Sequence, residues 1–221
     1  MTSKQLQRTV FRANASTSGF RASTGRLLRD GYLVRLLEPV PGGEGGGRGQ
    51  NVYRLGDAGW WLLRKPGAYT RRRSVDYHAL AIGDLYLAML DAQDAGWMKV
   101  RYIEIEAEAL RTVGGVMVTP DIYVEVVNVE RRTVRPFAIE VDRGSEHRPQ
   151  ILDKVRRYRE AKRANDYADV YESFPDVIFL AHDRARAEQL KRWIGKDTHV
   201  DGDRVFYFGL LDSFPGALRT P

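Results

Sequence analysis

Cysteine is absent from the 221 residues, which excludes disulfides and thiolate metal sites. Histidine is scarce, and His78, His147, His182 and His199 are scattered without the spacing of metal ligands. Any bound metal should therefore be held by oxygen atoms and resemble Mg²⁺ or Mn²⁺. The chain also lacks a long apolar run and a signal peptide at Met1, so we expect a soluble, cytoplasmic protein with no membrane partner.

Acidic residues are scarce in the first third of the chain. Residues 1–75 carry 14 Lys and Arg against 4 Asp and Glu, whereas residues 76–221 carry 21 against 25. The net charge of +6 thus hides a basic N-terminal part and a mildly acidic remainder. Such a basic part favours binding to a polyanion such as double-stranded DNA, although a solvated surface has the same composition.

Hydrophobic spacing predicts two helices and a hairpin in the basic part. The segments 2–11 and 16–33 combine capping Thr or Ser residues with apolar residues at helical spacing. Two strands, 32–40 and 51–56, flank the glycine-rich loop PGGEGGGRGQ. This order, with the pattern RLLRDGYL…VYRLGDAGWWLL, resembles a winged helix-turn-helix DNA-binding domain, which we assign to residues 1–63. In that fold the second helix enters the major groove and the wing touches phosphate.

The resemblance also implies which side chains contact DNA. They are Arg21, Arg26, Arg29 and Arg48, joined by Arg71, Arg72 and Arg73 from a basic linker at residues 64–74. Most winged helices have a further helix before the one at 2–11, so we expect that helix to be trimmed or supplied by a partner. A module of this kind used only for protein contacts is the alternative.

Residues 75–221 alternate between helical and strand patterns. We predict helices over 75–95, 148–165 and 183–195, and strands over 100–107, 118–130, 133–142, 176–182 and 204–211. The order α-β-β-β-α-β resembles the core of the PD-(D/E)xK nuclease-like fold. The expected fold class is therefore α/β (α+β), with a winged helix in front of a nuclease-like domain.

That resemblance brings a motif, an Asp after Pro on one strand and Glu-x-Lys on the next. Asp121 follows a proline, and Glu140 lies 19 residues later at the end of the following strand. Asp142 stands where the motif has Lys, on the same face of the strand as Glu140. Lys154 on the following helix is placed to substitute for the missing lysine, with Tyr158 four residues beyond it.

Three close carboxylates repel one another unless a cation or a proton lies between them. Asp121, Glu140 and Asp142 are hard oxygen ligands for Mg²⁺ or Mn²⁺, and Lys154 would offset charge on a phosphodiester during hydrolysis. Further carboxylates that could reach the same ion are Glu104 and Glu146. In the alternative interpretation, Glu140 and Asp142 belong to a structural ion network whose cations are Arg143, Arg148 or Lys154.

Several segments together extend the resemblance over nearly the whole chain. They are HALAIGDLYLAML, TPDIYVEV, FAIEVDRGSE followed by KVRRY, and FPDVIFLAHDRARAEQL. Behind a winged helix, they resemble the replication-relaxation family of plasmids and other mobile elements. The resemblance implies DNA binding in plasmid replication or relaxation, with a replication or mobilisation protein as a partner.

Three functions remain open from the sequence. The first is a DNA-binding accessory protein whose second domain is not catalytic. The second is a Mg²⁺-dependent endonuclease or nickase that uses Asp121, Glu140, Asp142 and Lys154. The third is a transcriptional regulator, which leaves the acidic cluster without a role.

Overall fold

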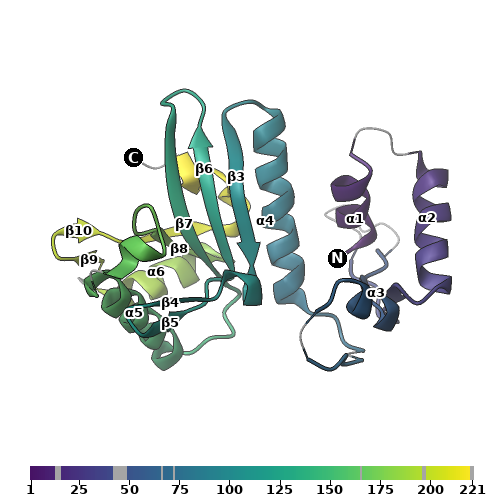
Figure 1. The fold of residues 1–221 in the computed structure, drawn as a ribbon, viewed down its shortest axis with the longest axis horizontal. Coiled ribbons are helices and arrows are strands. Elements are labelled where there is room, and N and C mark those ends of the chain that lie inside the picture. Colours follow the sequence, from purple (N-terminus) through teal and green to yellow (C-terminus); the bar gives the residue numbers. More distant parts are fainter. Residues whose placement is uncertain are drawn as a thin grey trace. The chain divides into compact units, whose positions relative to one another are not determined.

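The computed structural model describes residues 1–12, 16–41, 49–65, 67–71, 73–164, 166–195 and 198–219. The chain forms two compact units, residues 1–87 and 88–221, and each is described by itself. Helix α4 (Tyr77–Asp94) begins in the first unit and ends in the second (Figure 1). Within the described residues, every helix falls short of the length and hydrophobicity that a membrane span requires.

Helix α1 (Ser3–Val10) is held at its start by a capping box. The Thr2 hydroxyl accepts a hydrogen bond from the Gln5 N–H at 3.1 Å, and the Gln5 side chain accepts one from the Thr2 N–H at 2.9 Å. The buried Gln5 amide also donates to the Leu80 carbonyl at 2.8 Å and to Asp84 at 2.7 Å. Gln5 therefore fastens α1 to the first half of α4.

Helix α2 (Thr17–Arg29) begins at Ser16, whose hydroxyl accepts a hydrogen bond from the Gly19 N–H at 3.0 Å. The ring of Phe20 is buried and meets the ring of Phe11 edge-on, with 5.6 Å between centroids. This contact packs the start of α2 against the end of α1.

A two-stranded hairpin follows the helices. β1 (Leu33–Arg35) pairs antiparallel with β2 (Tyr53–Leu55), and the short helix α3 (Asp57–Leu62) comes next. A small apolar cluster lies under the hairpin and is formed by Leu36, Val40, Val52 and Leu80. The predicted order of helix, helix, strand and strand is confirmed, whereas α3 was not predicted.

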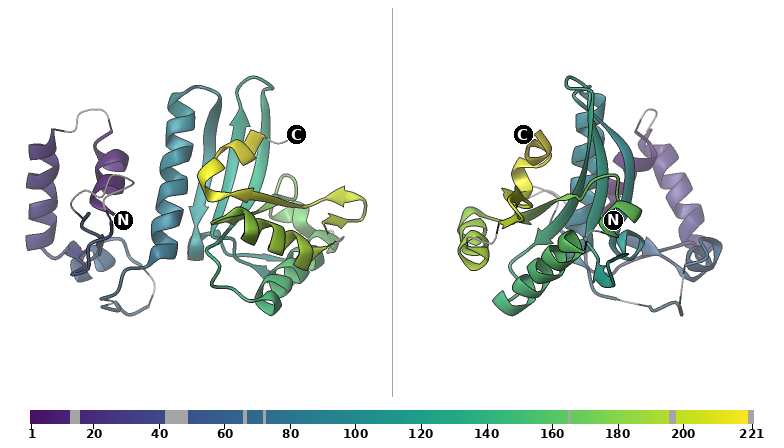
Figure 2. Two further views of the ribbon diagram at one scale, coloured as in Figure 1. Left: turned by 180° about the vertical axis from the view of Figure 1, so that it is seen from behind. Right: turned by 60° about the vertical axis from the view of Figure 1, so that its left-hand side comes forward.

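The C-terminal unit contains a five-stranded mixed sheet in the order β11-β8-β7-β6-β3. β3, β6 and β7 are antiparallel neighbours, whereas β7, β8 and β11 run parallel (Figures 1 and 2). The elements after α4 are β3 (Met98–Ile105), β4 (Arg111–Val113), β5 (Val116–Val118), β6 (Ile122–Asn128), β7 (Thr133–Asp142), α5 (Arg148–Arg163), β8 (Asp176–Ala181), α6 (Arg184–Ile194), β9 (His199–Val200), β10 (Asp203–Arg204) and β11 (Phe206–Leu210). The predicted α+β class and the order α-β-β-β-α-β of the main elements are confirmed.

Helices α5 and α6 cover one face of this sheet (Figure 2). Their apolar side chains interlock with those of β7, β8 and β11 in a core that includes Ala138, Ile151, Val155, Phe179, Leu190 and Phe206. Glu140 and Asp142 lie on the same face of β7 as Ala138, because alternate residues of a strand share a face. The packing of the two helices thus decides which groups the two carboxylates meet.

A small hairpin, β4–β5, interrupts the main order between β3 and β6. Its turn consists of Gly114 and Gly115, both with positive φ. A Cβ atom on Gly114 would lie 2.0 Å from the Cβ of Ala164, just after α5, so position 114 has no room for a side chain.

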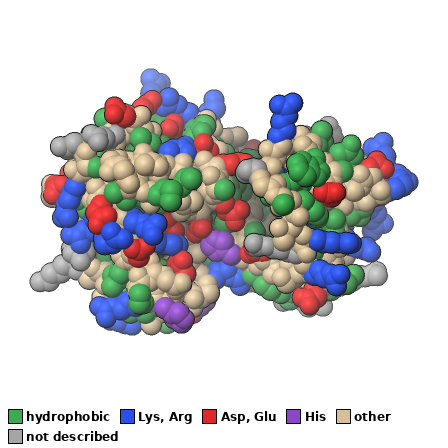
Figure 3. Space-filling model, turned by 60° about the horizontal axis from the view of Figure 1, so that its bottom comes forward, with side chains coloured by type: hydrophobic (Ala, Val, Ile, Leu, Met, Phe, Trp, Pro, Cys, Tyr) green, Lys and Arg blue, Asp and Glu red, His purple; other side chains and the backbone are tan. Residues whose placement is uncertain are grey.

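The two units differ in charge. Residues 1–87 carry 14 Lys and Arg against 6 Asp and Glu, whereas residues 88–221 carry 21 against 23. On the surface in view in Figure 3, Lys and Arg side chains outnumber acidic ones on the N-terminal unit and are interspersed with them on the C-terminal unit. The excess of positive charge therefore lies in the N-terminal unit.

Candidate functional site

Glu140 lies near the end of β7 with only 2% of its surface exposed. One carboxylate oxygen accepts a hydrogen bond from Lys154 Nζ at 2.8 Å, and the other accepts one from the Tyr158 hydroxyl at 2.7 Å. Lys154 Nζ also lies 2.9 Å from the Glu146 carboxylate. Because Lys154 and Tyr158 are four residues apart on α5, one helical face provides both partners of Glu140.

Burial governs the protonation of this group. It raises the pKa of Glu140 to about 7, against the opposing effect of Lys154 and with a smaller contribution from Asp121. Burial also acts to lower the pKa of Lys154, yet the carboxylates of Glu140 and Glu146 raise it above its ordinary value. Burial next to Glu140 raises the pKa of Tyr158 as well, so this hydroxyl remains a hydrogen-bond donor. Glu140 is thus the group of this cluster that changes charge near neutral pH.

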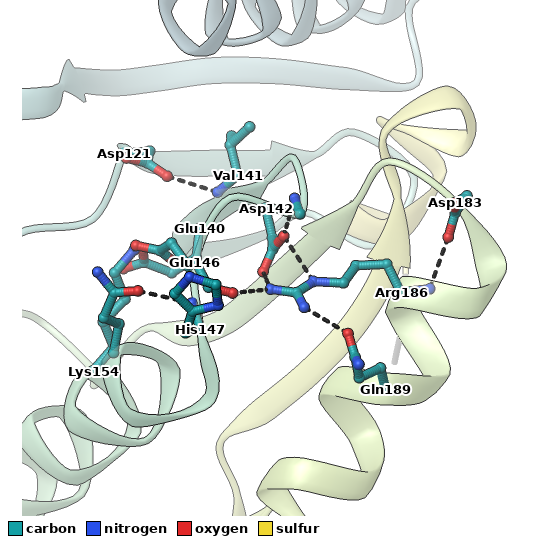
Figure 4. A network of polar contacts seen from close by, with 12 residues as sticks. Asp121, Glu140, Val141, Asp142, Glu146, His147, Lys154, Asp183, Arg186 and Gln189 are labelled. Atoms are coloured by element: carbon teal, nitrogen blue, oxygen red, sulfur yellow. Dashed lines mark hydrogen bonds and ion pairs between the residues drawn. The ribbon is translucent and has the colours of Figure 1, made fainter.

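Asp142 is neutralised by a separate partner. Its two oxygens accept hydrogen bonds from Nε and an Nη of Arg186 at 3.0 and 2.8 Å, and both side chains are almost fully buried (Figure 4). The Gly144 N–H also donates to Asp142, at 2.6 Å. The same guanidinium donates to the Gln189 side chain and to the Glu146 carbonyl. Two parallel bonds of this type give a strong, oriented ion pair.

Asp121 lies just before β6 and is half-buried. One of its oxygens accepts a hydrogen bond from the Val141 N–H, between Glu140 and Asp142, at 2.7 Å (Figure 4). The β6–β7 pairing, with Ile122 opposite Ile139, therefore brings the predicted Pro-Asp and Glu-x-Asp segments together.

The three predicted metal ligands nevertheless do not form one site. Among the described residues, no group of three acidic or histidine side chains is arranged to hold a metal ion. Asp142 is committed to Arg186, while Glu140 pairs with Lys154 and lies close enough to Asp121 for that carboxylate to raise its pKa. Of the two further candidates, Glu104 pairs with Arg111 and Glu146 pairs with Lys154. The donor set thus does not fit a three-carboxylate Mg²⁺ or Mn²⁺ centre.

The ion network predicted as the alternative is present, but with a different cation for Asp142. Lys154 pairs with Glu140 as expected, whereas Arg186 rather than Arg143 or Arg148 pairs with Asp142. Part of the evidence for the position of Arg186 is in the sequence, because Asp183 predicts that a helix begins directly after β8. Only the parallel register, with Asp142 opposite Ala181, shows that the first turn of α6 lies next to Asp142.

The predicted DNA-contacting arginines fall into two groups. Arg48 and Arg72 lie outside the described residues. Those that the structure describes are exposed, and they are Arg21, Arg26 and Arg29 on α2, and Arg71 and Arg73 between the hairpin and α4.

The family model for replication-relaxation matches residues 1–177. This match spans the basic N-terminal unit, β7 with its two carboxylates, and α5 with Lys154. No curated protein matches the chain. Because the family model covers well over half of the sequence, the chain belongs to the replication-relaxation family.

Proposed function

We propose that this protein binds double-stranded DNA through a winged helix-turn-helix in residues 1–63 and acts as a non-catalytic accessory protein. The family relates the chain to replication or relaxation of plasmids and other mobile elements. In this proposal, residues 64–74 form a basic linker, and residues 75–221 form a nuclease-like domain that docks a replication or mobilisation protein.

The observation that carries DNA binding is the two-faced surface of α2. Phe20 and Thr24 are buried on one side of this helix, whereas Arg26 and Arg29 are exposed on the opposite side and Arg21 is exposed on the flank between them. Arg29 lies near an acid, Asp30, but at 3.9 Å and with both side chains largely exposed. Such a pair contributes little, so this arginine can exchange its partner for a phosphate or a base edge.

The observation that favours a non-catalytic C-terminal unit is the internal pairing of the acidic motif. Glu140 is engaged by Lys154 and Tyr158, and Asp142 is engaged by Arg186. A group that takes part in hydrolysis has to exchange such partners for metal, water or substrate. The buried Asp142–Arg186 pair resists that exchange, because breaking it leaves a charge unpaired in the protein interior.

Changing both Arg26 and Arg29 to Gln should weaken duplex binding by about tenfold or more near physiological salt and reduce the salt dependence. Each lost phosphate contact lowers the slope of log K against log salt by about 0.9. Fluorescence anisotropy with a labelled duplex over a salt series measures both effects. An α6 control pair, Arg184→Gln with Arg192→Gln, removes the same charge from exposed positions of the other unit. Equal losses of duplex affinity in the two double variants would contradict DNA binding through α2.

A Mg²⁺- or Mn²⁺-dependent endonuclease or nickase is the second candidate. It is favoured by the neighbouring carboxylates of Asp121 and Glu140 and by the Lys154 ammonium 2.8 Å from Glu140. In this candidate, those two carboxylates would hold the ion and Lys154 would face the phosphate.

Supercoiled plasmid separates the two candidates. The accessory-protein proposal expects the plasmid to stay intact with Mg²⁺, Mn²⁺ or chelator. Metal-dependent nicking that disappears in Asp121→Asn would establish the nuclease instead. A thermal melt of the same samples adds an independent result, since an ion that binds only the folded state raises the melting temperature.

A further inference from the structure

Helix α5 concentrates positive charge in a unit that is otherwise acidic. It carries seven Lys and Arg against two acids, whereas the rest of residues 88–221 carries 14 against 21. The basic residues of α5 are Arg148, Lys154, Arg156, Arg157, Arg159, Lys162 and Arg163. Only Lys154 serves the Glu140 cluster, so the site described above does not explain the other six.

Three of these arginines line one groove. The cavity has a volume of about 340 Å³, and we call it the arginine groove; its lining is Leu152, Val155, Arg156, Arg159, Glu160 and Arg163. These residues recur every three or four positions and therefore follow one stripe of the helix. Arg156 and Arg163 are separated by about 10 Å along the axis, at roughly 1.5 Å per residue. The groove is large enough to hold part of a ligand rather than a single water molecule.

The acidic partners of Arg156 and Arg163 are exposed and exchangeable. Arg156 bonds Glu160 at 2.9 Å and Asp153 at 2.6 Å, on a surface where all three side chains are at least 40% exposed. Arg163 lies 3.7 Å from Asp201, and both are more than half exposed. Exposed pairs of this kind are weak and are screened by salt, so a ligand with stronger negative charge can displace them.

We propose that the arginine groove binds consecutive phosphate groups of a nucleic-acid backbone, as a contact of the C-terminal unit distinct from α2. Guanidinium groups recognise phosphate oxygens through paired hydrogen bonds. Three arginines in a row along the helix match a chain of phosphate groups better than a single phosphate. The apolar floor of Leu152 and Val155 carries no hydrogen-bonding group that would read a base, so the contact is independent of sequence.

The test uses the full chain and a fluorescein-labelled DNA duplex, with the same strand unpaired as a second probe. Arg156→Gln with Arg163→Gln is the main variant, because both side chains are exposed and their loss leaves the core intact. Arg159→Gln is a separate variant at the half-buried centre of the groove. The α6 control pair, Arg184→Gln with Arg192→Gln, removes equal charge from the same unit. Anisotropy is measured between about 50 and 200 mM salt.

The expected result is a salt slope reduced by about two in the groove double variant and by about one in Arg159→Gln. The α6 control pair should keep the wild-type slope. The proposal is overturned if the groove variants keep that slope, or if the control pair loses as much as they do. A loss confined to the unpaired probe would identify single-stranded nucleic acid as the source of the phosphates. Loss of binding in the Arg26 and Arg29 variant alone would leave DNA binding by α2 standing without the groove.

Discussion

Replacing Arg186 by Met should destabilise the C-terminal unit by about 3–5 kcal/mol, the usual cost of removing one partner from a buried ion pair. Asp142 would remain 2% exposed and would lose both guanidinium hydrogen bonds. The Glu146 carbonyl and the Gln189 side chain would lose a donor as well. Denaturant unfolding followed by tryptophan fluorescence measures the change, because Trp193 lies against the Arg186 guanidinium at 4.7 Å.

Two variants test the reason for that loss. Arg184→Met removes an exposed arginine from the same helix and should change stability by at most about 0.5 kcal/mol. Asp142→Leu combined with Arg186→Met should recover much of the loss, since apolar residues of similar volume often replace a buried pair at little cost. If the double variant is as unstable as Arg186→Met alone, the unpaired carboxylate is not the cause.

The second large effect concerns Glu140 and pH. Its pKa is about 7 in the folded chain against 4.5 in the unfolded chain, so the folded state favours the protonated carboxyl. The stabilisation is fully present below pH 4.5 and is lost as the pH rises through 7. We expect the wild type to lose on the order of 3 kcal/mol over that window, at roughly 1.4 kcal/mol per pKa unit. Glu140→Gln, which stays neutral, should lack this dependence. Unfolding free energies from pH 4 to pH 8 measure the difference.

Glu146→Gln is the matched control for that series. Glu146 shares the Lys154 ammonium with Glu140 but is far more exposed, with 29% of its side-chain surface accessible against 3%. Because burial is the main cause of the shift at Glu140, Glu146→Gln should keep the wild-type pH dependence. An unchanged pH dependence in Glu140→Gln would show that another group is responsible.

Local patterns in the sequence were sufficient for most of the fold. The strands predicted over 133–142 and 176–182 correspond to β7 and β8, and the caps Ser16 and Asp183 begin α2 and α6. Glu140 and Asp142 do share a face of β7, as strand geometry requires. Period and capping act over a few residues, so the sequence records them directly.

Such local patterns do not predict which distant residues cover a given face of the sheet. Whether Glu140 and Asp142 meet a metal, a lysine or an arginine depends on which helix turns cover them, and those turns come from residues 154 and 186. The β4–β5 hairpin was not predicted, apart from Val118 at the start of the strand predicted over 118–130, because its three-residue strands are too short to show a period.

The parallel pairing of β7 with β8 has a consequence for the lifetime of the folded chain. Asp142 and Arg186 are 44 residues apart and meet only after α5 has crossed from one strand to the other. Contacts of such long sequence separation require loop closure first and tend to form late in folding. An interaction completed after the folding barrier slows unfolding and leaves the folding rate nearly unchanged. We therefore expect the Asp142–Arg186 pair to determine how long the folded unit persists and to have little influence on how quickly it forms.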